Sequence, residues 1–562
     1  MQIFKNPQLL ANRLLLVVCL SLPWLNPFTS APSTSVIPLL LSWMLVGCAL
    51  LLVVDEASTT RSASLIQTVA KNKWSLVLLA WFLTSALLVP KVIDRALTAG
   101  VLASIACVWI AIQIGRRAVE LVDGLLPWLL ATWVFAATVS SMLAVLQYLD
   151  MARDLSPWVN QPRVGDAFAN LRQRNQFASL TSIGLVALLG WVANIRSLSK
   201  SHVAMVWCVL ALLAAGLACS VSRTGAVQWL VVVALVMAWV WRQGKQVHPL
   251  LLWLAMGALP LVVFWSLVLP WVALERNGIM GASLLLRVAG QVQDYAACGG
   301  RRVLWSNALQ MLAQQPWLGW GLGETDFAHY STDYQTERFC DLLDNAHNFP
   351  LHLALELGLP FALATCVLAM HWLFAQGKTT KFSPTQCIAF AMLLVLGLHS
   401  MLEYPLWYGP FQITLGLALG MWSSSSRIGE INTNNVTSTQ HIFPMFVCST
   451  LFLACLYAAW DYNRIAQIYK QPEKRDAAYR DNPMQAASQS WLFKNQADFA
   501  RLMTQNITLE NAQETYDLAM RVLHYSPEPR VVEHAVQSLK LLGRDLEAEK
   551  LASRIPTVTP NK

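Results

Sequence analysis

Long apolar stretches separated by short polar connections dominate this sequence, and they decide what the chain can fold into. Of its 562 residues, 56% are hydrophobic and 13% are charged, whereas a soluble domain carries roughly 25% charge. A hydrocarbon core about 30 Å thick takes roughly 20 apolar residues per helix. We therefore predict an all-α, polytopic transmembrane helix bundle of about 13 spans (range about 11 to 14), near residues 9–27, 35–54, 74–90, 96–114, 125–149, 177–193, 203–219, 225–241, 249–273, 350–373, 386–401, 406–422 and 442–460.

The basic residues of the connections indicate how this bundle is oriented. With the N-terminus placed in the cytoplasm, fourteen Lys and Arg fall on the cytoplasmic side and three in the short connections opposite. Lys and Arg collect in cytoplasmic loops during insertion, so the formal net charge of +8 does not indicate a nucleic-acid partner. An odd number of spans places the C-terminal segment and the connections 150–176, 220–224, 274–349 and 402–405 on the non-cytoplasmic face.

Charge also divides the chain into parts, because residues 461–562 hold 27 of the 72 Asp, Glu, Lys and Arg. Apolar residues recur there at helical spacing between Pro and Gly breaks, a pattern similar to tetratricopeptide repeats. This tail could dock an acceptor protein or simply cap the membrane domain. The predicted parts are N-terminal transmembrane helices (1–149), a catalytic core (150–425) that includes the loop 274–349, a last span with its cytoplasmic linker (426–460), and a soluble helical domain (461–562).

Most of the polar and charged residues with a potential chemical role lie at span ends on the non-cytoplasmic face. A transporter places ionisable groups at mid-membrane, where these spans have almost none. Arg172, Arg174, Asn175 and Gln176 precede a span whose first backbone N–H groups and dipole favour anions. Arg223 lies between two apolar helices, where a cation is costly without a partner. Both clusters indicate an anionic ligand, with interfacial anchoring as the alternative.

The longest connection adds two more arginines and a histidine. Arg301 and Arg302 open a stretch with helical spacing of apolar residues, so we expect a helix over 302–315 across the outer surface. His347 stands beside Asn348 at the mouth of the next span, and an imidazole can take and return a proton near neutral pH. We therefore predict that His347 is a general base.

Two other patterns in this connection indicate neither a phosphate loop nor a metal site. Gly319, Gly321 and Gly323 follow no strand, so they predict a turn. His347 and His352, five residues apart, do not share a helix face, and we expect no metal.

A disulfide is expected between Cys298 and Cys340, which are the only two cysteines of the longest connection. The non-cytoplasmic compartment permits disulfides. Closing a loop of about 40 residues is worth roughly 3–4 kcal/mol in the chain-entropy model. Two free thiols are the alternative.

The order of these pieces resembles a known superfamily. Gln176 within Arg-Asn-Gln-Phe-Ala, the Ser-Arg-Thr-Gly at 222–225, Arg-x-x-Leu-Trp before Pro-Trp-Leu-Gly-Trp-Gly-Leu-Gly, and His347-Asn348 together resemble the O-antigen ligases and Wzy-type polymerases. The segment Glu403-Tyr404-Pro-Leu-Trp with a helical tail is more similar to the PglL-type protein O-oligosaccharyltransferases. The resemblance covers roughly residues 150–425.

The resemblance implies an inverting glycosyltransferase that needs no metal or other cofactor and works on the periplasmic side of a bacterial inner membrane. Its donor would be an oligosaccharide on undecaprenyl pyrophosphate, and its acceptor a Ser or Thr hydroxyl of an exported or pilin-like protein. Ligation of glycan to lipid A core and polymerisation of glycan repeats are the alternatives, and a lipid-linked glycan flippase is a more distant one.

Family residues map onto Gln176, Arg223, His347 and Tyr404, with either Arg301 or Arg302 as the arginine of the Arg-x-x-Leu-Trp element. Arginines can stabilise a pyrophosphate leaving group, and a base can activate the acceptor hydroxyl. A glycosidase-like carboxylate pair drawn from Glu324, Asp326, Asp341, Asp344 and Glu403 is the competing chemistry. The predicted roles are catalytic for His347, Tyr404 and Gln176, donor-binding for Arg223, Arg301, Arg302, Arg174 and Arg172, and substrate-orienting for Asn175, Asn348 and Glu403.

Overall fold

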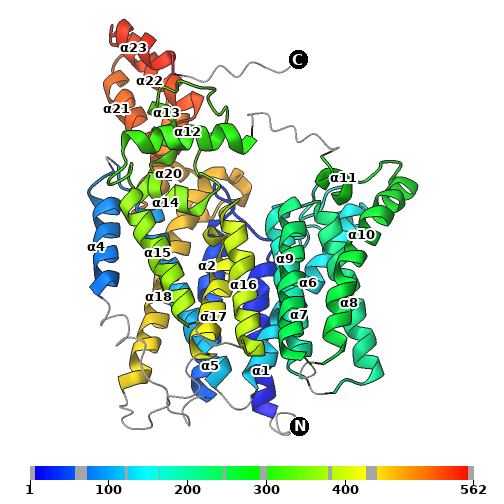
Figure 1. Ribbon diagram of the computed structural model, residues 1–562. Coiled ribbons are helices and arrows are strands. Elements are labelled where there is room, and N and C mark those ends of the chain that lie inside the picture. The colour runs from blue at the N-terminus through cyan, green and yellow to red at the C-terminus, as the bar shows by residue number, and fades with distance from the viewer. Residues whose placement is uncertain are drawn as a thin grey trace.

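The computed structural model is all-helical in the part of the chain that it describes (Figure 1). That part comprises residues 7–56, 73–90, 92–120, 124–163, 165–195, 197–244, 248–290, 300–376, 382–425 and 439–554. The predicted all-α membrane bundle is confirmed. Its long helices are α1 (Pro7–Leu25), α2 (Val36–Glu56), α4 (Lys73–Leu87), α5 (Arg95–Glu120), α6 (Leu125–Tyr148), α7 (Arg174–Ala193), α8 (Lys200–Ser220), α9 (Arg223–Gln243), α10 (Leu250–Asn277), α15 (Leu359–Gln376), α16 (Pro384–Ser400), α17 (Gly409–Ser425) and α18 (Thr439–Ala466).

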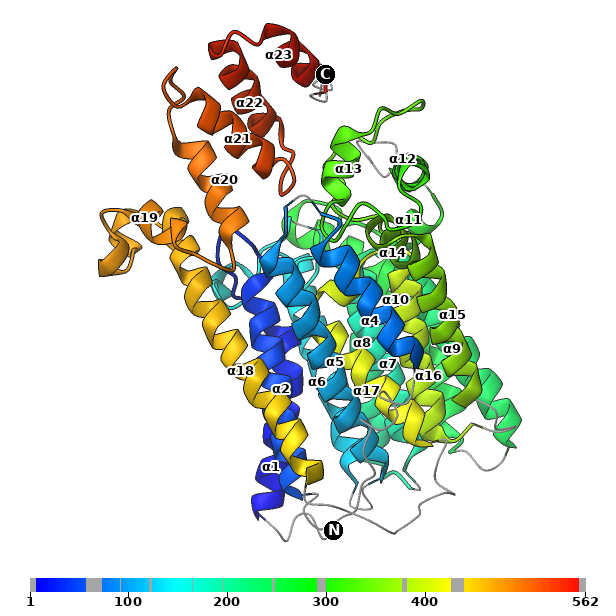
Figure 2. The ribbon, with the colours of Figure 1, turned by 90° about the vertical axis from the view of Figure 1, so that its left-hand side faces the viewer.

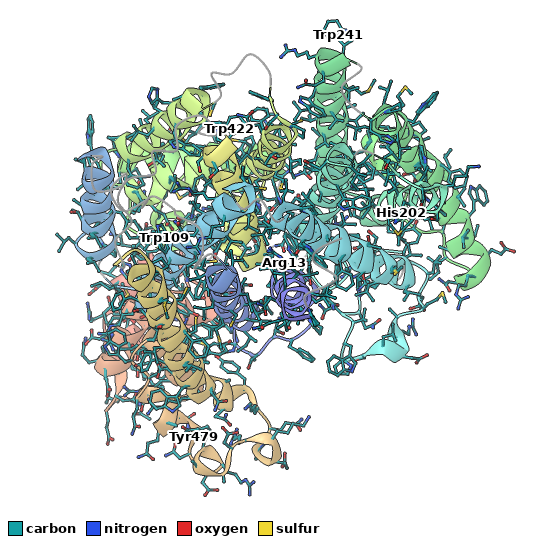
Figure 3. All side chains as sticks on the ribbon, turned by 90° about the horizontal axis from the view of Figure 1, so that it is seen from below. Arg13, Trp109, His202, Trp241, Trp422 and Tyr479 are labelled. Carbon is teal, nitrogen blue, oxygen red and sulfur yellow. The ribbon has the colours of Figure 1, made fainter. Side chains whose placement is uncertain are left out.

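Each predicted span falls on a helix, but the number that cross the membrane stays a prediction. Within the described ranges, nine helices are long and apolar enough to span it. The other four predicted spans fall on α4, α15, α16 and α17, which have 15 to 18 residues. The chain is therefore a multi-pass membrane protein. Seen from below, Trp241 of α9 points outward at the rim and is 84% exposed, whereas Arg13 of α1 is buried within the bundle (Figure 3).

The stretch 350–373, predicted as one span, is interrupted. A short helix, α14 (Phe349–Leu357), ends at Gly358, and α15 begins at the next residue. Gly358 has a φ of 90° and lies against the backbone of Trp317, while the Leu359 N–H donates to the Pro316 carbonyl oxygen at 2.9 Å. The break therefore depends on a connection about 40 residues upstream in sequence, which apolar periodicity does not reveal.

Small residues set how closely the bundle packs. A side chain at Gly115 of α5 would overlap the backbone of Leu417 in α17, and one at Gly416 or Gly420 of α17 would overlap the backbone of α5. Helices in membranes associate through such close backbone contacts, since lipid offers no hydrophobic drive. This contact fixes α17, and with it the connection that precedes α17, in the centre of the bundle.

The connections at one end of the bundle build a raised surface, which we call the loop face. It comprises residues 149–163, 165–173, 221–222, 278–290, 300–358 and 401–408 and lies opposite the N-terminus (Figure 1). Helix α12 runs across it, as predicted for 302–315. Its short elements are η3 (Arg153–Leu155), α11 (Leu284–Val288), α12 (Gly300–Gln314), α13 (Thr325–Ser331), α14 and η5 (Pro405–Trp407).

The tail stands on the same face (Figure 2). It is helical, as predicted, while its relation to tetratricopeptide repeats stays a prediction. The buried Asp461 at the end of α18 accepts hydrogen bonds from Ser490 and the Leu492 N–H, at 2.7 and 2.8 Å, and so joins span and tail. Its elements are η6 (Gln467–Tyr469), η7 (Pro472–Lys474), η8 (Ala477–Tyr479), α19 (Pro483–Ser488), α20 (Lys494–Thr504), α21 (Ala512–Val522), α22 (Pro529–Leu541) and α23 (Asp545–Ala552).

Candidate active site

Three segments far apart in sequence meet at one carboxylate of the loop face. Glu403, in the connection between α16 and η5, accepts a hydrogen bond from His347 Nδ1 on Oε2 at 2.8 Å. Its other oxygen, Oε1, accepts one from an Arg301 guanidinium nitrogen at 2.9 Å. The same nitrogen also donates to the Leu402 carbonyl oxygen at 2.7 Å. The structure therefore brings together an imidazole and a guanidinium from the longest connection and a carboxylate from the connection before η5.

Asn175 also hydrogen-bonds to the Glu403 carboxylate. Its Nδ2 donates to Glu403 Oε1 at 3.0 Å, and its Oδ1 accepts a hydrogen bond from the Ser222 hydroxyl at 2.7 Å. Ser222 in turn caps α9 by accepting from the Gly225 N–H at 3.1 Å. Both ends of the Asn175 amide are thus engaged by protein, so its contacts hold Glu403 in place relative to α7 and α9.

A strained turn presents His347. Its φ of 49° is in the left-handed region, which few non-glycine residues adopt and which is often found at functional sites. The His347 N–H donates to Asn345 Oδ1 at 2.7 Å, and Asn348 caps α14 by accepting from the Leu351 N–H at 3.1 Å. With Nδ1 donating to Glu403, the neutral ring keeps its lone pair on Nε2. The carboxylate therefore fixes the ring in the tautomer whose Nε2 can accept a proton.

The charge on Glu403 is maintained by its partners. Burial, the largest single influence, opposes ionisation, but the hydrogen bond from His347 and the charge of Arg301 hold the pKa of Glu403 below its ordinary value. Glu403 is thus an anion at neutral pH. An ionised carboxylate at Nδ1 stabilises the imidazolium that forms when the ring takes a proton.

Aromatic rings line the other side of the imidazole. The Tyr404 ring meets His347 edge-on with centroids 5.2 Å apart, and it lies 6.1 Å from the nearly parallel ring of Tyr408. Burial raises the pKa of Tyr404, so its hydroxyl stays protonated and able to donate. The Gln176 side chain also hydrogen-bonds to Tyr408. Tyr404 therefore contacts His347 directly, whereas Gln176 is linked to it through Tyr408.

The predicted donor-binding arginines lie in different surroundings. Arg301 faces Glu403, whereas Arg302, the next residue on α12, is exposed. Arg223 is exposed at the start of α9. Arg174 lies 3.8 Å from Asp166, and Arg172 donates to the Pro27 carbonyl oxygen. Arg172 therefore contacts the α1–α2 connection.

Two residues of the site were given no role from the sequence, although Ser222 belongs to the Ser-Arg-Thr-Gly motif. Ser222 precedes a helix and could have been recognised as an N-cap. Arg287 of α11 is half-buried and donates to the Val221 carbonyl oxygen at 3.1 Å, which places a further cation beside the α8–α9 turn. No local signal in the sequence marks Arg287, because the contact depends on how α11 folds back.

The glycine turn, the cysteines and the potential metal ligands of the loop face lie as follows. Gly319, Gly321 and Gly323 all have positive φ values and form a turn against α14, which confirms the turn. Cys340 is disulfide-bonded, but Cys298 lies outside the described residues, so their pairing stays a prediction. Across the described ranges there is no group of three His, Cys, Asp or Glu side chains suited to a metal ion.

Comparison with known families supports the reading of these motifs. A family model described as O-antigen ligase matches residues 208–366, and one described as protein glycosylation ligase matches residues 167–191. A third, the C-terminal part of a virulence factor membrane-bound polymerase, matches residues 387–560. The resemblance to the O-antigen ligase superfamily is confirmed. The O-antigen ligase match includes Arg223, Arg301 and His347, and the polymerase match includes Glu403 and Tyr404.

Two relatives from Acinetobacter baylyi carry related names. A general O-oligosaccharyltransferase is 25% identical over 337 residues, which are 58% of this chain and 55% of that protein. A ComP-specific O-oligosaccharyltransferase is 24% identical over 331 residues, which are 58% of this chain and 56% of that protein. The chain thus spans about half the length of the curated relatives it matches.

Proposed function

We propose that this protein transfers a preassembled oligosaccharide from undecaprenyl pyrophosphate to Ser or Thr hydroxyls of exported proteins. The observation that carries the proposal is the placement of His347 and Arg301 on the two oxygens of Glu403. Transfer of a glycan from a lipid pyrophosphate to a hydroxyl requires a base for the hydroxyl proton and a cation for the leaving group, both at the same membrane face. The names of the two relatives support protein as the acceptor.

In the proposed reaction His347 acts as the general base. Its Nε2 takes the proton of the acceptor hydroxyl while the hydroxyl oxygen forms a bond to the anomeric carbon of the sugar. The bond from that carbon to the pyrophosphate oxygen breaks, and its electron pair leaves with the pyrophosphate. Attack from the face opposite the leaving group inverts the anomeric configuration. A positioned base of this kind contributes about 10²–10⁴-fold.

Arginines would balance the charge that develops on the leaving group. Arg301 uses one nitrogen on Glu403 and Leu402, and a guanidinium has five N–H donors in a fixed fork. Arg223 is exposed at the start of α9, where the helix dipole also favours an anion. We assign the pyrophosphate to these two arginines, with Arg302, Arg174 and Arg287 as further candidates around them.

The competing carboxylate-pair chemistry has less support. In the described part of the structure, the charged or basic partners of Glu403 are His347 and Arg301. Glu324, a candidate for the second carboxylate, hydrogen-bonds to His524 in the tail. Pyrophosphate is in addition a good leaving group that needs little acid assistance.

Two observations support a periplasmic site in a bacterial inner membrane. The Lys and Arg excess lies in the connections opposite the loop face, as expected for cytoplasmic loops. Cys340 of the loop face is disulfide-bonded, which fits an oxidising compartment. On this proposal the donor approaches from the outer leaflet.

The test is to produce the full chain with a lipid-linked glycan pathway and a panel of exported proteins, and to measure intact masses. We expect glycan on protein with the wild type and none with His347→Ala or Arg301→Ala. Arg153→Ala, in an exposed pair with Asp150 on the same face, is the matched control and should stay active. Glycan found instead on lipid A core, or as longer glycan chains, would replace the proposed acceptor with one of the alternatives.

A further inference from the structure

The tail makes a buried polar contact with the loop face. His524, just after α21, shares a hydrogen bond between Nδ1 and Oε2 of Glu324 at 2.6 Å, and the two side chains are 9% and 4% exposed. The ring of Phe327 stacks on His524 with centroids 3.8 Å apart. The other Glu324 oxygen makes no hydrogen bond to the described residues. Loss of His524 would therefore leave a buried carboxylate without its main partner, which is costly.

Helix α13, which follows Glu324, is part of the tail's core. Tyr330 of α13 belongs to one buried cluster with tail residues that include Leu502, Leu518 and Val531. The hydrogen bond at Glu324 and this apolar cluster lie at opposite ends of a helix of seven residues. The tail therefore holds α13 along its whole length.

The residues before α13 are fixed in turn to α14. The buried Glu356 of α14 accepts hydrogen bonds on Oε1 from the Gly323 N–H and the Thr325 hydroxyl, both at 3.0 Å. Backbone bonds from Trp320 and Gly321 to the last turn of α14 add to this attachment, at 2.8 and 3.1 Å. Helix α14 begins at its cap Asn348, and the residue before that cap is His347.

We propose that His524 is a positioning residue for His347, acting through Glu324, the start of α13, and Glu356 of α14. The inference rests on the proposed function, since it assigns the tail a role in holding the base of that site. It differs from an acceptor-docking role, because the contacts of His524 and of the Tyr330 cluster join the tail to its own chain. Without His524 the segment 345–351 loosens, and His347 spends less time against Glu403.

The first test measures this coupling without any transfer reaction. Hydrogen exchange of the full chain in detergent or nanodiscs reports on the amides of His347 and Leu351, which donate to Asn345 and Asn348. We expect His524→Ala to speed their exchange about 10-fold or more. His524→Asn, which keeps an N–H close to the position of Nδ1, should restore it. His534→Ala is the matched control, since among the described residues the His534 side chain bonds to a backbone oxygen of its own helix and to no other group.

Unchanged exchange at both amides in folded His524→Ala would overturn the proposal. If that variant does not fold, Phe327→Leu removes the ring stacked on His524 and keeps apolar bulk. It should give faster exchange at the same two amides, and exchange equal to the wild type would count equally against the proposal.

The second test separates positioning from docking. In glycan transfer, a positioning role predicts that His524→Ala lowers kcat about 10-fold, leaves KM for the acceptor protein within about 2-fold, and is rescued by His524→Asn. A raised KM with unchanged kcat would overturn the proposal in favour of docking. If the wild type transfers no glycan, the proposed function fails, while the exchange measurement still decides whether the tail holds the His347 segment.

Discussion

Asn175 joins two connections of the loop face, with its Nδ2 3.0 Å from Glu403 Oε1 and its Oδ1 2.7 Å from the Ser222 hydroxyl. The amide therefore relates the cap of α9, which carries Arg223, to the carboxylate that orients His347. One side chain therefore links the residue that contacts His347 to the residue that precedes Arg223.

Replacing Asn175 by Leu keeps its size and removes both hydrogen bonds. We expect kcat to fall roughly 10–100-fold, since a hydrogen bond to a charged group is worth about 1.5–3 kcal/mol. Ser222→Ala removes one neutral bond and should cost roughly 2–10-fold. Initial rates of glycan transfer give both values. A raised acceptor KM in Asn175→Leu, with Ser222→Ala at the wild-type rate, would instead mean that Asn175 contacts substrate.

Glu403→Gln tests the carboxylate itself. Glutamine offers one acceptor oxygen where Arg301 and His347 Nδ1 both donate, so one of them loses its acceptor. We expect kcat/KM to fall about 10²–10⁴-fold, the contribution of a well-placed base. Glu547→Gln, which changes an exposed tail carboxylate paired with Arg544, serves as the control. A Glu403→Gln rate within about 3-fold of the wild type would refute the assigned role.

The bundle and the location of the site could be predicted from the sequence, because both depend on local signals. Apolar stretches long enough to form a helix predict the position of each span. The helical spacing of apolar residues after Arg302 predicts α12. The alternation of spans placed Arg223, Arg301 and His347 on one face. These inferences need only neighbouring residues and the thickness of a bilayer.

The central place of Glu403 could not be predicted in this way. Its partners His347, Arg301 and Asn175 are 56, 102 and 228 residues away in sequence, and their contact depends on how α7, α12 and α16 pack. Which of Arg301 and Arg302 contacts Glu403 could not be predicted either, because this also depends on how the helices pack. Adjacent residues point about 100° apart on a helix, so only the docking of α12 decides which one faces Glu403.

His329 makes the loop face sensitive to acid. Burial, aided by the charge of Arg338 and opposed by a hydrogen bond to the Phe339 carbonyl oxygen, lowers the pKa of His329 from 6.5 to about 4. The unfolded chain therefore binds a proton that the folded chain does not, between about pH 6.5 and 4. His329 stabilises the fold fully above pH 6.5, and this contribution, of order 3 kcal/mol, is lost as the pH falls toward 4.

The measurement is hydrogen exchange of residues 325–343 at pH 7 and pH 5, corrected for the intrinsic rates. Protection should fall at pH 5 in the wild type. His329→Gln cannot take up the proton, so its protection should change less between the two values. Equal pH dependence in both proteins would show that another group is responsible.

Gly358 makes the break between α14 and α15, and with it the direction in which α14 presents His347. Its φ of 90° is unfavourable for any residue with a Cβ, and a side chain there would overlap the Trp317 carbonyl oxygen. We expect Gly358→Ala to cost at least about 2 kcal/mol through strain and overlap. Thermal unfolding should shift downward by several degrees, and transfer should fall because the His347 turn moves. Gly397→Ala within α16, where an added Cβ meets nothing within 4 Å, should leave both unchanged. Equal melting temperatures for the two variants would mean that the chain can relax around Gly358 and that the break does not depend on glycine.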